Sequence, residues 1–343
     1  MKITAIKTAE VGGHGFSLFV KIFTDEGLVG IGEAIHGGGG VTRIVEDLAE
    51  FLIGENPLDV DRLFESLRRR HIFNGADGGH FVTALTGIEI ALWDLAGKAL
   101  NVPVYRLLGG KFRDRIRLYC DCHAGRDGTP ESYAECAKEV VGLGFNAIKF
   151  DIDDANSRHK LDRFNWSVTP GELTEMVEKV SAVREAIGPE VDLAIDMHGR
   201  YDTYAAIRIA QAMEPFNLMW LEEPVPPENV AAMREVKRST RTPLCAGENL
   251  YLRWGFRDLL EQQAVDVIMP DLPKCGGLSE GRKIANMAEV YYIPFAPHNV
   301  CGPVGTIASC HACATIPFPT SWYWSGTGPT DPTGTIWSWP TPL

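Results

Sequence analysis

Three short runs of apolar and β-branched residues stand at the start of the chain. They are separated by glycine-containing turns and lie at 1–8, 16–24 and 28–34. Apolar residues then recur with the helical period at about 41–54, 57–71 and 82–100. Strands followed by helices are typical of an α+β unit, which we predict over residues 1–112.

From about residue 116, short apolar runs that end in polar residues alternate with amphipathic stretches. The runs lie at 116–122, 146–153, 192–198, 219–224, 243–249, 265–271 and 293–299. The helical stretches between them include 173–187, 205–213, 230–239, 257–263 and 280–290. Repeated βα units imply a parallel sheet, and seven or eight of them imply closure into a barrel. We therefore predict an α/β barrel over residues 113–317, with an inserted loop at 154–171.

The composition narrows the classes of function. The chain has 343 residues and a formal net charge of −12, which argues against a nucleic-acid partner because such binding needs a basic face. No apolar run approaches the roughly 20 residues that span a bilayer. The first residues also lack the apolar core of a signal peptide. We therefore expect a cytoplasmic protein that does not contact a membrane.

The chain has eight cysteines, which we expect to be reduced thiols in a cytoplasmic protein of this size. Cys310 and Cys313 have the spacing of half a zinc site, but no second matching pair accompanies them. We interpret them as small residues on a late helix.

Acidic residues end three successive runs of the predicted barrel. Asp196, Glu222 and Glu248 are separated by 26 residues each, the length of one βα unit, and Asp271 and His298 follow at intervals of 23 and 27 residues. Parallel strands of a barrel end at one mouth, where such barrels place catalysis, so these side chains should converge. Neighbouring carboxylates repel one another without a cation between them. The oxygen-only ligand set predicts Mg²⁺.

Several motifs together resemble those of the enolase superfamily, mandelate racemase subgroup, and within it the D-galactonate dehydratase-like sugar-acid dehydratases. They are ALWDLAGKALNVPVYRLLGG, KFD, DMHGR, WLEEP, GEN, PD followed by KCGG, and APH. The resemblance runs to about residue 317 and implies a modified TIM barrel of the (β/α)7β type under an N-terminal α+β capping domain. It also implies one Mg²⁺ per subunit, a homo-oligomer and the dehydration of a small-molecule sugar acid (an aldonate) to a 2-keto-3-deoxy acid.

The resemblance assigns roles to the residues at the strand ends. Asp196, Glu222 and Glu248 match the family's metal ligands, and His298 with Asp271 matches its base dyad. A carboxylate bound to the metal acidifies the α-proton, because the metal stabilises the enediolate that forms when His298 removes it. Asp271 would fix the tautomer of His298 and raise its basicity.

His198 matches the family's second acid/base histidine and would protonate the departing 3-hydroxyl group. It lies two residues after Asp196, so alternation along a strand should point both side chains into the mouth. Lys149 and Asp151 occupy the position of a Lys-x-Lys pair in racemases of the subgroup, and Asp151 in place of the second lysine disfavours a two-base racemase. We expect Lys149 to bind the substrate carboxylate or to support the metal ligands, and Asp151 to contact a hydroxyl group. An ion pair between the two is the alternative.

Further residues are expected around the substrate. In the capping domain, His14 and the glycine-rich loop 73–80 are predicted to close over it. Asn249 is expected either to bind substrate or to support the metal ligands. Glu223 follows Glu222 directly and should point the other way.

The C-terminal residues 318–343 depart from the family pattern. They are rich in Trp, Thr, Pro and Gly and show neither strand nor helix periodicity. The family has a glutamate on its eighth strand, but no acidic residue lies between His298 and Asp331. With suitable codons, a shifted reading frame of the segment around Trp322 encodes Val-Leu-Glu. We therefore interpret the tail from about Phe318 as the product of a frameshift in the gene, the clone or the sequence record. In a protein that carries this tail, we expect a damaged eighth strand and impaired activity.

Three functions are compatible with these features. The first is a Mg²⁺-dependent hydro-lyase that acts on galactonate, gluconate, arabinonate, xylonate or a similar aldonate. The second is a racemase, epimerase or cycloisomerase on the same scaffold, which would exchange the α-proton without forming a keto acid. The third is a catalytically impaired barrel that binds metal or sugar acids, for which the tail is the main argument. A two-metal hydrolase is disfavoured because the first strand lacks a His-x-His pair.

Overall fold

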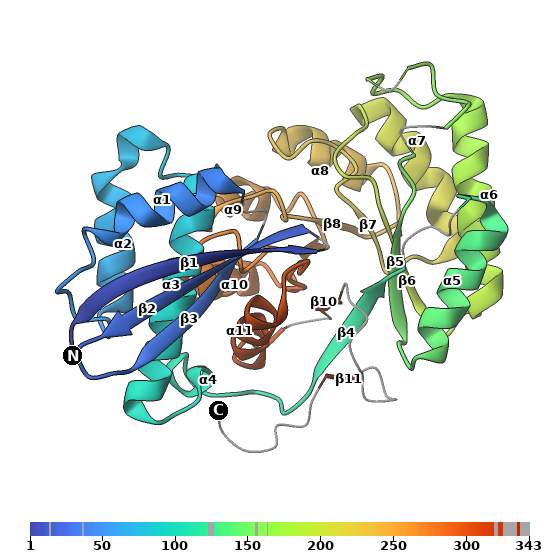
Figure 1. The fold of residues 1–343 in the computed structure, drawn as a ribbon. Coiled ribbons are helices and arrows are strands. Elements are labelled where there is room, and N and C mark those ends of the chain that lie inside the picture. The colour runs from blue at the N-terminus through green and yellow to red at the C-terminus, as the bar shows by residue number, and fades with distance from the viewer. Residues whose placement is uncertain are drawn as a thin grey trace.

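The computed structural model describes residues 1–13, 15–35, 38–122, 127–154, 157–162, 164–318, 322–324 and 335–336. The N-terminal part is an antiparallel sheet packed on helices (Figure 1). Its strands are β1 (Ile3–Gly13), β2 (Gly15–Thr24) and β3 (Val29–Ala34). Its helices are α1 (Gly39–Ala49), α2 (Val60–Arg70), α3 (Gly79–Leu100) and α4 (Val104–Leu107), with a 3-10 turn at Ile72–Asn74. Strand β1 runs past its predicted end at residue 8 because its pairing with β2 continues to Gly13.

The C-terminal part contains a curled sheet in which six parallel strands, β4 to β9, pair in their order along the chain, and two strands of the tail are added at β4. The six strands are β4 (Ile116–Asp121), β5 (Ala147–Asp151), β6 (Asp192–Asp196), β7 (Trp220–Glu222), β8 (Leu244–Ala246) and β9 (Val267–Ile268). The helices are α5 (Pro130–Gly142), α6 (Pro170–Ile187), α7 (Thr203–Met213), α8 (Val230–Arg238), α9 (Leu252–Glu261), α10 (Gly277–Val290) and α11 (Pro303–Ala314), with a 3-10 turn at Glu214–Phe216. In the seventh predicted run, Phe295 forms a single parallel bridge with Ile268. The predicted fold, a modified TIM barrel with an N-terminal α+β capping domain, is confirmed.

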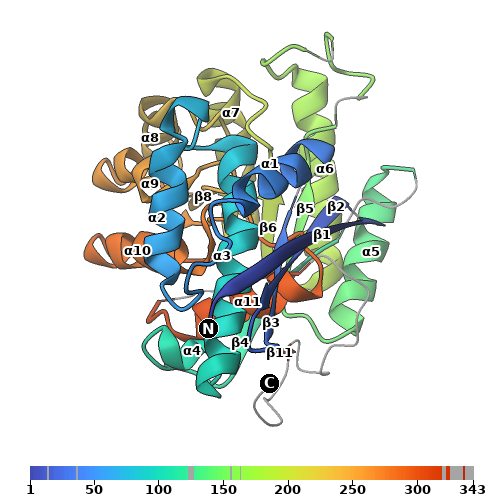
Figure 2. The same cartoon turned by 60° about the vertical axis from the view of Figure 1, so that its left-hand side comes forward.

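Helix α3 is the central element of the N-terminal part. It lies against the sheet on one side and contacts α10 of the barrel on another (Figures 1 and 2). All of its residues from Phe81 to Leu92 are buried, so it has no continuous polar face. Even so, no helix in the described part of the chain is long and apolar enough to cross a membrane.

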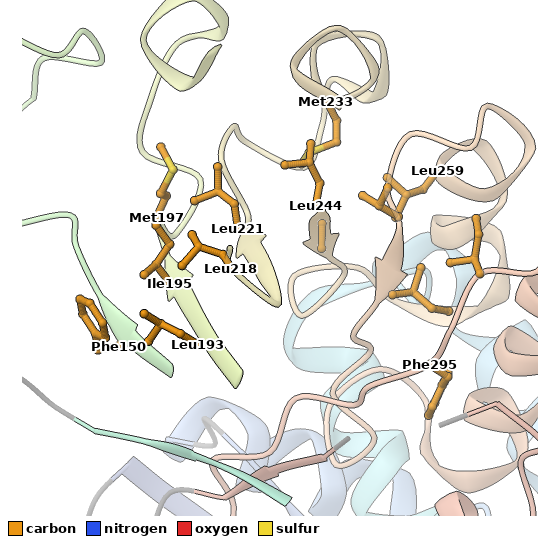
Figure 3. Packing of buried hydrophobic residues seen from close by; sticks show 14 of the residues in the cluster. Phe150, Leu193, Ile195, Met197, Leu218, Leu221, Met233, Leu244, Leu259 and Phe295 are labelled. Atoms are coloured by element: carbon orange, nitrogen blue, oxygen red, sulfur yellow. The ribbon is translucent and has the colours of Figure 1, made fainter. Parts of the chain in front are cut away.

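Strand residues divide between the two faces of the curled sheet. Leu193, Ile195, Leu221 and Leu244 belong to a cluster that includes helix residues such as Met233 (Figure 3). The alternate positions form a second cluster without helix residues, made of Tyr119, Ala147, Ala194, Trp220, Cys245, Val267, Met269 and Ala296. Because side chains alternate along a strand, the residues two positions after Ala147, Ala194 and Trp220 share the inner face. These residues are Lys149, Asp196 and Glu222.

Two short strands lie in the C-terminal tail. Strand β10 (Trp322–Trp324) pairs in parallel with β4, and β11 (Thr335–Ile336) pairs antiparallel with it. These segments differ from the irregular tail that the sequence predicts, because the edge of β4 offers unpaired backbone groups to any extended segment. The other residues after Phe318 lie outside the described part. The domain boundaries and the frameshift therefore stay predictions.

Candidate active site

Three carboxylates meet where β6, β7 and β8 end. Asp196 and Glu222 are the last residues of β6 and β7 and are partners in the strand register, and Glu248 follows β8 by two residues. Oxygen atoms of the three side chains lie within 4.8 Å of one another. The side chains of Asp196 and Glu222 are completely buried, and that of Glu248 is 13% exposed. The cluster that the spacing predicts is therefore formed, and its ligand set can hold a divalent metal ion.

Lys149 lies beside these carboxylates. Its Nζ atom is 2.7 Å from Oδ2 of Asp196 and 2.5 Å from Oε1 of Glu222. Burial opposes ionisation of Asp196, but Lys149 and His198 outweigh it and lower the pKa of this carboxyl group. Burial and Asp196 raise the pKa of Glu222 well above its ordinary value. Lys149 brings one positive charge to a group of three carboxylates, and a divalent cation would offset the negative charge that remains. Of the roles expected for Lys149, its contacts match support of the metal ligands.

His298 faces the same cluster from the segment after Phe295. Its Nδ1 atom is 2.7 Å from Oδ2 of the fully buried Asp271, and its Nε2 atom is 3.0 Å from Oε2 of Glu248. Burial opposes protonation of the imidazole, but Glu248 and Asp271 raise its pKa to about 9. The contact with Asp271 leaves Nε2 as the ring nitrogen that is directed at the carboxylates.

His198 forms a second histidine–carboxylate pair. The predicted placement of His198 beside Asp196 is observed, but not by the predicted strand alternation, because β6 ends at Asp196 and His198 has a left-handed backbone (φ 49°). Its Nδ1 atom is 2.9 Å from Oδ1 of Asp153. Its Nε2 atom then lies 3.8 Å from Oδ2 of Asp196 and 3.9 Å from Oδ1 of Asp151. Burial opposes protonation of His198, but Asp153 and Asp196 raise its pKa to about 9.

Asp153 is a site residue that the sequence did not reveal. Its side chain is 2% exposed and also accepts a hydrogen bond from Nη1 of Arg200 at 2.5 Å. The sequence offered one indication of its role: Lys149, Asp151 and Asp153 are spaced two residues apart, as side chains on one face of a strand are. That indication is weak because β5 ends at Asp151. Burial and the nearby Asp121 raise the pKa of Asp151 to about 6.

Asn249 links three charged side chains. Its Nδ2 atom donates to Oε2 of Glu223 at 2.9 Å and to Oε1 of Glu248 at 3.1 Å, and its Oδ1 atom accepts from Nζ of Lys274 at 3.1 Å. Burial and Glu248 raise the pKa of Glu223 to about 7. The contacts of Asn249 match the support of a metal ligand, although its exposed side chain also leaves it accessible to a substrate.

The segment 73–80, predicted as a glycine-rich loop, lies near this end of the barrel, and its last two residues are the first two of α3. A Cβ atom at Gly78 would be 3.5 Å from Cδ2 of Tyr251, which follows Asn249 by two residues. Phe73, on the same loop, is 98% exposed. The role of this loop as a lid stays a prediction. His14, its expected companion, lies outside the described residues.

Two family descriptions match the chain. "Mandelate racemase / muconate lactonizing enzyme, N-terminal domain" matches residues 4–109, and "Enolase C-terminal domain-like" matches residues 132–332. The first range covers β2, β3, α1–α4 and all of β1 except its first residue. The second contains β5–β9 with their helices, and therefore the three carboxylates and both histidines described above.

Named proteins are similar to this chain over most of its length. A D-xylonate dehydratase from Haloferax volcanii is 48% identical over 92% of this chain and 76% of its own length. A D-galactonate dehydratase from Variovorax paradoxus is 36% identical over 90% of this chain and 78% of its own length. The crystal structure of a mandelate racemase/muconate lactonizing enzyme-like protein from Rubrobacter xylanophilus is 50% identical, with a TM-score of 0.92 over 94% of this chain and 86% of that one. A 3,6-anhydro-D-galactonate cycloisomerase from Zobellia galactanivorans is 29% identical, with a TM-score of 0.85 over 96% and 88%.

Proposed function

The chain belongs to the mandelate racemase/muconate lactonizing enzyme family of the enolase superfamily, and on this premise we propose that it dehydrates a sugar acid. The substrate is an aldonate and the product is a 2-keto-3-deoxy acid. The names of two relatives, D-xylonate dehydratase and D-galactonate dehydratase, favour xylonate and galactonate as the first aldonates to test.

Two anchored histidines beside one carboxylate cluster carry this proposal. Elimination of water breaks a C–H bond and a neighbouring C–O bond, so it needs a base for the α-proton and an acid for the leaving hydroxyl group. Nε2 of His298 lies 3.0 Å from Glu248, and Nε2 of His198 lies 3.8 Å from Asp196. Each imidazole is held at Nδ1 by a buried aspartate, so each presents Nε2 to the cluster.

Asp196, Glu222 and Glu248 are the residues that would hold the metal. We assign Mg²⁺, one per subunit, because the three ligands are all oxygen atoms and an octahedral Mg²⁺ would have further positions for waters or oxygen atoms of a substrate. When bound, the cation stabilises the negative charge that develops on the substrate carboxylate as the α-proton leaves.

The histidines then divide the proton transfers. In its neutral form, His298 accepts the α-proton at Nε2, while Asp271 holds the tautomer through Nδ1. His198 gives the proton on its Nε2 atom to the 3-hydroxyl group, which leaves as water. The C2–H and C3–O bonds break, a C2–C3 double bond forms, and the resulting enol tautomerises to the ketone. We assign Asp151, close to Nε2 of His198, to a hydroxyl group of the substrate.

Isomerisation on the same scaffold is the second candidate function. It is favoured by the likeness to the cycloisomerase from Zobellia galactanivorans. A barrel that binds metal and sugar acids with impaired catalysis is the third. It is favoured by the sequence Trp-Tyr-Trp of β10, which has no acidic residue.

A screen of aldonates with Mg²⁺ tests the proposal. Xylonate, galactonate, gluconate and arabinonate are incubated with the protein, and keto acid is detected with semicarbazide. Proton NMR in deuterium oxide measures exchange of the α-proton in parallel. Formation of a 2-keto-3-deoxy acid from one substrate supports dehydration. Exchange without keto acid would favour isomerisation, and neither reaction would favour the binding function.

A further inference from the structure

Two buried carboxylates of the N-terminal domain each reach the beginning of a barrel helix. Glu33, in β3, accepts hydrogen bonds from the backbone N–H groups of Gly302 at 2.5 Å and Gly305 at 2.9 Å. Glu89, in α3, accepts from the N–H groups of Leu278 at 3.0 Å and Ser279 at 2.9 Å. The two glutamates are at most 1% exposed. Glu33 thus caps α11, and Glu89 caps α10.

The two helices have no side-chain caps of their own. Their N-cap residues are Gly302 for α11 and Gly276 for α10, and neither start has a capping side chain from the same helix. The first N–H groups of a helix need acceptors, and a carboxylate there also interacts favourably with the helix dipole. The glycines leave room for this contact, since a Cβ atom would lie 2.8 Å from Oε1 of Glu33 at Gly302 and 2.1 Å from Oε2 of Glu89 at Gly277.

The two residues of the base dyad lie in the segments that lead into these two helices. His298 lies four residues before Gly302, and Asp271 lies six residues before Gly277. The segment with Asp271 has further contacts with the N-terminal domain, because Oγ1 of Thr86 accepts from the N–H of Gly276 at 2.9 Å. The N-terminal domain therefore contacts both segments. The segments meet where Nδ1 of His298 lies 2.7 Å from Oδ2 of Asp271.

The metal cluster has a different support. Asp196 and Glu222 belong to the sheet itself, and their register is set by the backbone pairing of β6 with β7. Glu248 is held by Asn249 of the barrel. A disturbance at Glu33 or Glu89 should therefore act directly on the dyad, and on the metal ligands only indirectly, through the 3.0 Å contact between His298 and Glu248.

We propose that Glu33 and Glu89 are positioning residues that align His298 with Asp271 from the N-terminal domain, and so govern proton abstraction. The kinetic part of this inference rests on the proposed function; the alignment itself does not. A misplacement of about 1 Å at a reacting group costs on the order of 100-fold in rate. The variants Glu33→Gln and Glu89→Gln keep the side-chain size but turn one accepting oxygen into a donor that faces a backbone N–H.

The alignment is tested without substrate. Nitrogen-15 NMR of the histidine rings reports the Nδ1–H proton of His298, which is assigned by its loss in His298→Asn. We expect this signal to shift or broaden in Glu33→Gln and in Glu89→Gln. It should stay unchanged in Glu65→Gln, a control that removes a different interdomain contact, the 3.4 Å ion pair of Glu65 with Arg253. An unchanged signal in both capping variants would overturn the proposal, whether or not the protein dehydrates aldonates.

The kinetic consequence is tested on an aldonate that the wild type converts or exchanges. In both capping variants we expect α-proton exchange to fall by about 10- to 100-fold, with Mg²⁺ affinity within twofold of the wild type by calorimetry. Exchange per folded molecule is measured after the folded fraction is determined by circular dichroism. A rate per folded molecule equal to that of Glu65→Gln would show that the glutamates act only on folding. A parallel loss of Mg²⁺ binding would show that they act on the whole site and not on the dyad.

Discussion

The Nζ atom of Lys149 lies 2.7 Å from Oδ2 of Asp196 inside the barrel, and neither side chain is more than 2% exposed. A buried ion pair is costly to break, because the remaining charge is left without a partner in a poorly solvated place. This contact also joins β5 to β6 at the end where the carboxylates converge. Lys149 thus contributes to the stability of the metal-free cluster.

Replacing Lys149 by Met should destabilise the metal-free protein by about 3–5 kcal/mol. The reason is that Asp196 and Glu222 lose the ammonium group between them, and Mg²⁺ should restore part of the loss. Urea unfolding with EDTA and with Mg²⁺ measures both effects. Arg43→Gln, which removes an exposed ion pair with Asp47, is the control and should change stability by less than about 1 kcal/mol. Equal losses in the two variants would contradict the prediction.

Removal of metal should abolish activity reversibly. We expect EDTA to stop α-proton exchange and added Mg²⁺ to restore it, because Asp196, Glu222 and Glu248 form the oxygen cluster. Asp196→Asn should raise the Mg²⁺ concentration needed for half-maximal activity at least about tenfold, because loss even of a residue that supports a metal ligand costs about 10- to 100-fold in metal affinity. The exposed Glu235→Gln is the matched control. Full activity in EDTA would exclude the proposed metal role.

The two histidines should separate the two half-reactions. His298→Asn is expected to lose both α-proton exchange and dehydration, whereas His198→Asn should keep exchange and lose dehydration by about 10²–10⁴-fold. Asp153→Asn should also lower the rate of dehydration, but by a smaller factor, because it removes only the partner of Nδ1 of His198. Proton NMR in deuterium oxide and the keto-acid assay give the two rates. A His198 variant that dehydrates at the wild-type rate would leave the acid role to another residue.

His311 should make the fold sensitive to acid. Burial lowers its pKa to about 4, and its Nδ1 atom accepts a hydrogen bond from the N–H of Tyr105. Between pH 6.5 and 4 the unfolded chain binds a proton at this residue and the folded chain does not, so stability falls as the pH falls through this window. The loss at this residue is up to about 3 kcal/mol. In urea unfolding from pH 7 to pH 4, His311→Gln should lose less stability than the wild type. The exposed His80→Gln should follow the wild-type curve; a His311 variant that also follows it would show that the buried imidazole is not responsible.

The frameshift interpretation of the tail makes a prediction at the level of the gene. We expect the template DNA to contain an inserted or deleted base near the codon of Phe318, and correction of the frame to supply Val-Leu-Glu around residue 322. The corrected protein should dehydrate its substrate faster, because a glutamate is restored to the eighth strand. An uninterrupted gene together with an intact mass that matches the present sequence would rule the frameshift out.

Much of the fold and of the carboxylate cluster could be predicted from the sequence. Each βα unit has a local hydrophobic period that a short window reveals. The equal spacing of Asp196, Glu222 and Glu248 indicated that they meet, because successive parallel strands end at the same mouth. The length of the seventh strand could not be predicted. The run 293–299 has seven residues, but in the structure only Phe295 forms a β-bridge.

The contacts beyond the strand ends could not be predicted in the same way. His198 and Glu223 have left-handed backbones, so strand alternation does not fix the direction of their side chains. Asp153 became visible as the partner of His198 only through that turn. Glu33 reaches Gly302 across 269 residues, and a contact of that separation has no local period.

The sequence by itself therefore determined which elements form and which strand ends converge, because both follow from local hydrophobic periodicity and the parallel course of the strands. The tertiary structure alone decided that Lys149 lies among the carboxylates, that Asp153 holds His198, and that the N-terminal domain caps the helices behind the base dyad. These contacts depend on how turns and two domains pack together, which no short window of the chain encodes.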